Sequence, residues 1–151
     1  MASETEREVF RAHREAQTRY TYFLLAAAGA AIALAVNQTQ ESALSLTQLP
    51  LAAAVLSWGL SFFFGCRNLG YVASTLFANL DLLRVESGNH PQVGYNPQMM
   101  AAARDGIREA IEINSKRANL LGHCQFRALV AGGVLYVLWH VVEMYMRTIR
   151  R

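Results

Sequence analysis

Residues 49–66 read LPLAAAVLSWGLSFFFGC and contain no charged side chain, and Arg67 follows them directly. An α-helix rises 1.5 Å per residue, so this run approaches the length that crosses the hydrocarbon core of a bilayer. The runs 20–36 (YTYFLLAAAGAAIALAV) and 126–146 (FRALVAGGVLYVLWHVVEMYM) are uncharged or nearly so. One such run suits the core of a soluble protein, but three in 151 residues leave too little polar surface to cover them. We therefore expect an all-α integral membrane protein with spans at about 20–37, 49–67 and 126–146.

The helical pattern does not stop where the second apolar run ends. Apolar residues continue at alternating steps of three and four, which is typical of a helix that packs against another helix in a coiled coil. They are Cys66, Leu69, Ala73, Leu76, Leu80 and Leu83. Residues 87–91 (SGNHP) then supply Gly and Pro, which end helices. We predict one helix from 49 to 86. Its seam at Leu69, Ala73, Leu76, Leu80 and Leu83 is a candidate contact surface, either between copies or against the chain's own helices.

The third helix should begin at Asn96, as the capping residue, with Pro97 in the first helical position. An inward stripe follows at helical spacing: Met100, Ala103, Ile107, Ile111, Asn114, Ala118 and Leu121. No proline interrupts the path into the third apolar run, so a single helix of about 50 residues is expected. The first helix should start at a capping box formed by Ser3 and Glu6.

The chain thus reads as a single membrane domain, 1–151, of three long helices that form a bundle. Each helix is apolar in one part and charged in another, with charged extensions at about 3–19, 68–86 and 97–125.

The basic residues favour a lipid bilayer with anionic headgroups as the partner, rather than nucleic acid. Of the 14 Lys and Arg residues, 13 are Arg, and most of them flank the apolar runs. The connection 37–48 contains no Lys or Arg, whereas the N-terminal segment and the connection between spans two and three contain several. The positive-inside rule therefore places the N-terminus and the long second connection in the cytoplasm. Ala and Arg usage favours a bacterial inner membrane. The rule is opposed at the C-terminus by Arg147, Arg150 and Arg151, which this topology places outside.

The candidate chemistry of the chain is sparse. His140 and Glu143 lie three apart on one face of the third run, and ionisable residues within a span are functional candidates, for example as a proton relay. In the alternative interpretation, Glu143 pairs with Arg147 one turn further on and is simply neutralised. His123 and Cys124 are adjacent, so on a helix they point in different directions and do not activate each other. We find no catalytic motif, and we expect no enzyme activity, cofactor or metal site.

In outline, the chain resembles the SLATT proteins, small bacterial membrane effectors with an N-terminal helix, a membrane hairpin and a cytoplasmic helical region that oligomerises. The third span departs from that outline. The resemblance implies an oligomeric membrane protein, either a channel-like effector or a sensor coupled to a cytoplasmic helical bundle. Two alternatives stay open. The first is a structural or assembly subunit that holds a larger cytoplasmic partner, and the second is a small transporter that uses His140 and Glu143.

Overall fold

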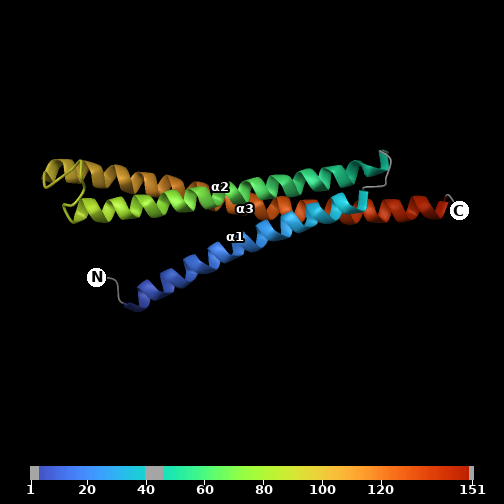
Figure 1. The fold of residues 1–151 in the computed structure, drawn as a ribbon, viewed down its shortest axis with the longest axis horizontal. Helices are drawn as coiled ribbons and strands as arrows, with labels where there is room; N and C mark the ends of the chain where they lie inside the picture. The colour runs from blue at the N-terminus through green and yellow to red at the C-terminus, as the bar shows by residue number, and fades with distance from the viewer. Residues whose placement is uncertain (1–3, 40–45, 150–151) are drawn as a thin grey trace. The chain divides into compact units, whose positions relative to one another are not determined.

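A computed structural model describes residues 4–39 and 46–149 of the chain. These residues form helices α1 (Glu4–Thr39), α2 (Leu49–Glu86) and α3 (Pro97–Ile149), with a short 3-10 turn, η1 (Leu46–Gln48), before α2, and they contain no strand (Figure 1). Each helix is long and apolar enough to cross a membrane. The all-helical prediction is confirmed, and so are the end of the second helix at Glu86 and the uninterrupted third helix of 53 residues. The predicted capping box includes Ser3, which lies outside the described residues.

Contacts group the chain into two compact units, where the sequence suggests a single domain. One unit consists of Met1–Cys66 and Gly122–Arg151, and we call it the apolar unit. The other is Arg67–Leu121, which we call the charged hairpin. Helices α2 and α3 each contribute a segment to both units without a break in their helical hydrogen bonding.

The end of α2 is fixed by its backbone. The N–H of Asn89 donates to the carbonyl of Arg84 at 2.9 Å, and the N–H of Gly88 donates to the carbonyl of Val85 at 3.1 Å. This is the Schellman pattern, which needs a left-handed residue between the two bonds. Gly88 has a φ of +72°, and a Cβ at this position would overlap the ring of Tyr95. Glycine is therefore required here for both backbone and packing reasons.

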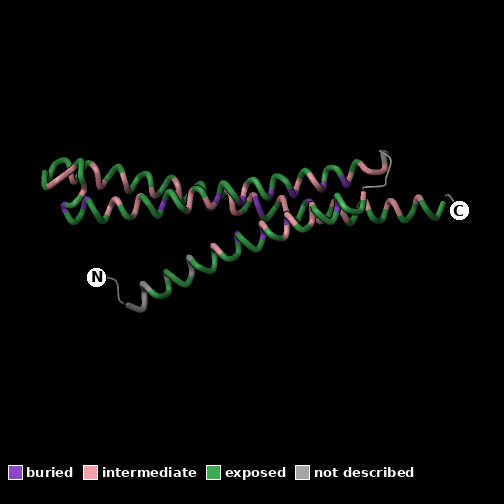
Figure 2. The backbone as a smooth tube through the Cα atoms, in the orientation of Figure 1, coloured by how far each residue is buried: buried purple, intermediate pink, exposed green. Residues whose placement is uncertain are grey.

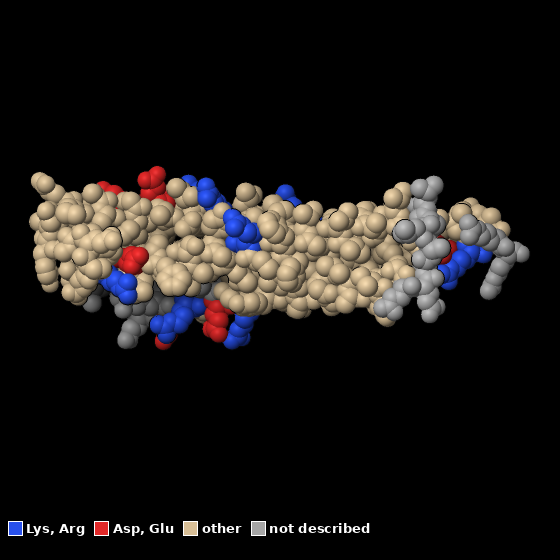
Figure 3. Space-filling model, turned by 45° about the horizontal axis from the view of Figure 1, so that its top comes forward, with Lys and Arg blue, Asp and Glu red and all other residues tan. Residues whose placement is uncertain are grey.

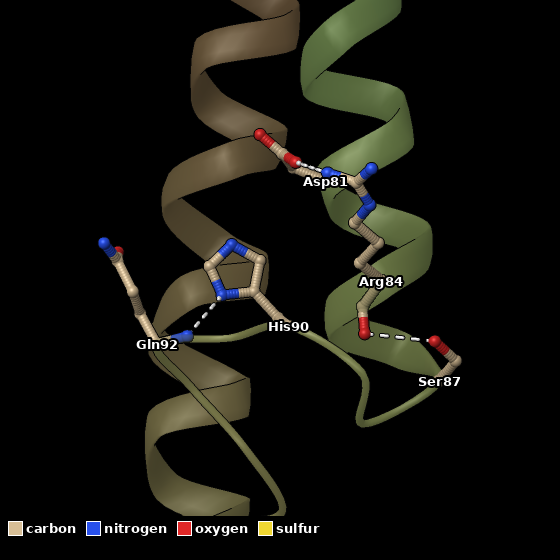
Figure 4. A network of polar contacts seen from close by, with 5 residues as sticks. All are labelled: Asp81, Arg84, Ser87, His90 and Gln92. Atoms are coloured by element: carbon tan, nitrogen blue, oxygen red, sulfur yellow. Dashed lines mark hydrogen bonds and ion pairs between the residues drawn. The ribbon is translucent and has the colours of Figure 1, made fainter.

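The turn after α2 is held by short-range contacts of its own (Figure 4). Arg84 pairs with Asp81 at 3.3 Å, and the hydroxyl of Ser87 donates to the Arg84 carbonyl at 3.1 Å. The N–H of Gln92 donates to Nδ1 of His90 at 3.3 Å. All of these contacts span three residues or fewer, so the turn closes without help from distant parts of the chain.

Helix α3 begins as the sequence predicts. Oδ1 of Asn96 accepts hydrogen bonds from the N–H groups of Gln98 and Met99, at 3.0 and 3.3 Å. Pro97, which has no N–H to satisfy, occupies the first helical position.

One seam of α2 faces α3 in both units, with alternating steps of three and four. In the apolar unit it consists of Leu51, Ala54, Trp58, Ser61 and Gly65, all buried. In the charged hairpin it continues as Asn68, Val72, Thr75, Asn79 and Leu82, all buried or half-buried. The predicted α3 stripe from Met100 to Leu121 is likewise buried or half-buried at every position.

Most of the large apolar side chains in the apolar unit point outward. Its buried cluster contains only Ala35, Leu51, Ala54 and Trp58, and most of the tube in Figure 2 is coloured as exposed or intermediate. Phe23, Leu56 and Val134 are among the exposed residues. On the face seen in Figure 3, the charged side chains leave a broad band free. An apolar exterior around a small, partly polar interior is the pattern expected of helices surrounded by lipid.

Candidate functional site

Side chains of α2 donate hydrogen bonds to the backbone of α3 throughout the apolar unit. The pairs are Ser57 to Ala128 at 3.0 Å, Trp58 to Leu129 at 3.3 Å and Ser61 to Gln125 at 2.9 Å. Each acceptor is a helical carbonyl, whose second lone pair remains free after its own backbone bond. A serine hydroxyl can also bond a carbonyl one turn earlier in its own helix, so donation to α3 is a contact between the helices that supports their antiparallel register.

Gln125 joins all three helices of the apolar unit. Its side chain is fully buried, and Nε2 donates to the carbonyl of Thr21 on α1 at 3.4 Å. Gly65 on α2 leaves the space for this amide, because a Cβ there would overlap Gln125 and Leu25. Oε1 of Gln125 is buried and has no hydrogen-bond partner among the described residues. Gln125 was not among the residues predicted from the sequence, although it continues the α3 stripe four residues beyond Leu121.

An aromatic group packs beside the buried cluster of the apolar unit. The ring of Tyr136 lies 5.7 Å from Trp58 and 5.7 Å from Trp139, centroid to centroid. The Tyr136 hydroxyl contacts Oε1 of Gln38 on α1 at 2.7 Å. Gly132 allows the Trp58 indole to approach α3, because a Cβ at this glycine would overlap that ring. The group therefore ties α1, α2 and α3 together at a second level.

Among the described residues, Glu143 pairs with Arg147, and no hydrogen bond joins it to His140. Oε1 of Glu143 lies 3.2 Å from Nε of Arg147, and the two side chains are 29% and 77% exposed. His140 is exposed, and its ring lies 6.2 Å from that of Trp139. The Glu143–Arg147 pair, the alternative considered from the sequence, is thus present. No group of three metal-ligating side chains occurs within residues 4–39 and 46–149.

The predicted seam on α2 lies one residue beyond the seam that faces α3. Each of its members follows an inward residue, so it lies about 100° further around the helix. Leu76, Leu80 and Leu83 are 47%, 44% and 63% exposed. The inward seam of the hairpin continues the spacing of Leu51, Ala54 and Trp58 along the same side of the helix. The packing of α2 on α3 in the charged hairpin therefore leaves four of the five seam residues exposed and Leu69 half-buried, and the role of the seam between copies stays a prediction.

A second polar group lies in the charged hairpin, immediately after the second apolar run. The guanidinium carbons of Arg67 and Arg117 lie 5.4 and 5.8 Å from the centroid of the Tyr71 ring. Nη2 of Arg67 donates to the Tyr71 hydroxyl at 3.3 Å. Tyr71 is four residues beyond the predicted span, and the pKa of its hydroxyl is lowered by Arg117 and by Arg67. Sequence spacing pairs Arg67 with Tyr71, but Arg117 joins them only through the register of α3.

Several other charged side chains of the hairpin form ion pairs at its surface. Glu86 lies 3.6 Å from Arg108 and 3.9 Å from Arg104, and Lys116 lies 2.6 Å from Glu112. Exposed pairs of this kind contribute little to stability, typically about 1 kcal/mol or less each. They describe a solvated surface rather than a reactive site.

No protein-family model, curated protein or solved structure matches this chain.

Proposed function

We propose that this protein is a homo-oligomeric membrane effector. Its apolar helices cross the bilayer. Its charged hairpin assembles with other copies on the cytoplasmic side, and this assembly is coupled to the membrane helices. The observation that supports this most directly is the uncovered apolar stripe on α2 in the hairpin. It consists of the half-buried Leu69 and the exposed Ala73, Leu76, Leu80 and Leu83, with Phe77 exposed beside it.

The stripe is unusual because the hairpin places polar residues inside and leucines outside. Asn68, Thr75 and Asn79 lie on the face towards α3. Asn68 donates to the Ala118 carbonyl of α3, whereas Thr75 and Asn79 each donate to a carbonyl one turn earlier in α2. A leucine side chain transferred from water into an apolar contact contributes about 1.5–3 kcal/mol. A stripe with steps of three and four matches a second copy of itself, which is how homo-oligomeric helices usually meet.

Coupling to the membrane follows from the continuity of the two helices. Ser61 binds the Gln125 carbonyl in the apolar unit, and Asn68 binds the Ala118 carbonyl in the hairpin, so the register of α2 on α3 is held within each unit. A helix rotation imposed by assembly in the hairpin acts on the same helices that form the membrane part.

A conducting path, if the output is channel-like, would form between copies. Ser57 and Ser61 direct their hydroxyls inward to α3, and the outward positions of the α2 apolar run are apolar. The hydroxyls of α2 are therefore occupied within each chain, and a path between copies would take no polar lining from the α2 apolar run. Channel-like activity and assembly should be lost together.

The test compares two pairs of added charges. Leu76→Glu with Leu80→Glu should abolish crosslinked multimers, while the monomer stays in the membrane and resists carbonate extraction. Ala102→Glu with Ala110→Glu adds the same charge at exposed α3 positions of the same hairpin and should leave the multimers intact. Ion flux into liposomes should follow the multimers.

Three results would count against the proposal. Multimers that survive the leucine substitutions would remove the stripe as the interface. Recovery of the protein in solution without detergent would remove the membrane location. Assembled wild-type protein without flux would favour the structural or assembly subunit over a channel-like effector.

A further inference from the structure

Arg67, Tyr71 and Arg117 bring two positive charges to one aromatic ring. Arg67 and Tyr71 are one turn apart on α2, and Arg117 reaches the same ring from α3. Both arginines are exposed and Tyr71 is half-buried, so the guanidinium groups are open to a ligand. The Tyr71 hydroxyl, already in contact with Arg67, adds a third polar group at the same place.

No carboxylate of the described residues forms an ion pair with either of these two charges. Residues 67–80 and 113–127 contain no Asp or Glu. Within the described part of the chain, the ion pairs include neither Arg67 nor Arg117. Lys116, the basic neighbour of Arg117, is already paired with Glu112. Two like charges converging on one ring repel each other, and an anion between them removes that cost.

The position of the two arginines is set by a buried bond directly beside them. Nδ2 of Asn68 donates to the carbonyl of Ala118 at 2.6 Å, and both residues are buried. Asn68 follows Arg67 and Ala118 follows Arg117 in the chain, so this bond fixes the register of α2 on α3 at the two arginines. The backbone positions from which both arginines reach the Tyr71 ring are thus set in the free protein, which reduces the ordering cost of binding.

We propose that Arg67, Tyr71 and Arg117 form a binding site for a phosphate-bearing anion, and that this anion is the headgroup phosphate of an anionic phospholipid. Guanidinium groups match phosphate oxygens through paired N–H donors. Arg67 is the first residue after the second apolar run, which places the site at headgroup level if that run crosses the bilayer. The choice of a lipid rests on the membrane location in the proposed function. Free phosphate shares the same chemistry, and the experiment distinguishes the two sources.

The experiment uses the full-length protein in detergent, with native mass spectrometry to count bound lipid. Phosphatidylglycerol and phosphatidylcholine are titrated separately, and phosphatidylglycerol is titrated again in the presence of inorganic phosphate. The wild type should prefer phosphatidylglycerol. Arg67→Gln with Arg117→Gln should weaken that binding by about tenfold or more, because each basic residue near an anionic lipid contributes about 1 kcal/mol.

A matched control separates the site from net charge. Arg84→Gln with Arg108→Gln also removes one arginine from each helix of the hairpin, and both of these arginines are held in ion pairs. This control should bind phosphatidylglycerol like the wild type. Equal losses in the two double variants would overturn the site, because binding would then depend on charge alone. Unchanged binding in the Arg67 and Arg117 variant would also overturn it.

The remaining outcomes concern the source of the phosphate and the folding of the variant. Displacement of phosphatidylglycerol by inorganic phosphate at a similar concentration would overturn the lipid assignment. Arg67→Lys with Arg117→Lys keeps both charges but loses the paired donors, so it should show a partial loss even if the glutamine variant fails to fold. Multimers and flux are measured on the same samples. Loss of lipid selectivity with intact multimers would show that the change affects this binding site alone. Loss of multimers with intact lipid binding would show that it affects the assembly on which the proposed function rests.

Discussion

The apolar unit and the charged hairpin share one α2 seam, but the surroundings of that seam differ. In the apolar unit, small or hydrogen-bonding residues face inward, and large apolar residues such as Leu56 and Phe63 face outward. In the hairpin, the inward face carries Asn68, Thr75 and Asn79, and outward leucines occur beside charged residues. Helices in lipid associate through close packing and hydrogen bonds, since burial from lipid contributes little. In the hairpin, Asn68 makes such a bond to α3, and the exposed leucines of the outward stripe are left available for another contact.

The closest packing in the apolar unit should give the largest effect on stability. Gly132→Leu would force its side chain into the Trp58 indole and should lower the free energy of unfolding by about 3 kcal/mol. Gly133→Leu is the matched control, because a Cβ at Gly133 meets no atom within 4 Å. Thermal unfolding in detergent measures both. Equal destabilisation would mean that the outward side of α3 is also packed tightly, for example against another copy.

Removing hydrogen bonds of the apolar unit should have smaller effects on the free energy of unfolding, and these effects should differ in sign. Ser61→Ala removes the donor to the Gln125 carbonyl and should cost about 0.6 kcal/mol, the mean for such bonds between membrane helices.

Gln125→Met keeps the volume but removes both the 3.4 Å bond to Thr21 and the unpaired Oε1. Because an unpaired buried acceptor costs about 1–3 kcal/mol, this change should be neutral or stabilising. A clear loss of stability in Gln125→Met would show that Oε1 has a partner, such as a bound water.

The comparison also shows which features a sequence can predict. The limits of α2 and α3 follow from local chemistry: Gly88 is needed for a left-handed cap, and Asn96 can bond to two backbone N–H groups of its own first turn. The inward seam of α2 does not follow from local chemistry. Leu76 and Leu80 give a stronger apolar pattern than Thr75 and Asn79. The side of α2 that faces α3 is nevertheless set by the inward residues earlier in the same helix.

Local sequence patterns also do not predict which residues contact one another between helices. Gln125 meets Thr21 across 104 positions, and Arg117 meets Tyr71 only through the antiparallel register of α2 and α3. That register depends on the length of the turn after Glu86 and on the Asn68–Ala118 bond. A helical stripe identifies the side of α3 that packs but not the α2 residue opposite each position.

The smallest expected effect concerns Glu143, the ionisable residue near the end of the third apolar run. Its carboxylate pairs with Arg147, and the exposure of the arginine keeps this pair in contact with water. Glu143→Gln should therefore change the free energy of unfolding by only about 0.5 kcal/mol, with multimers and ion flux unchanged. Arg147→Gln breaks the same pair from the other side and should give the same small change. A proton relay through Glu143 makes a different prediction, since it needs the carboxylate and not the arginine. Loss of flux in Glu143→Gln alone, in a normally assembled protein, would therefore assign a function to Glu143 beyond its ion pair.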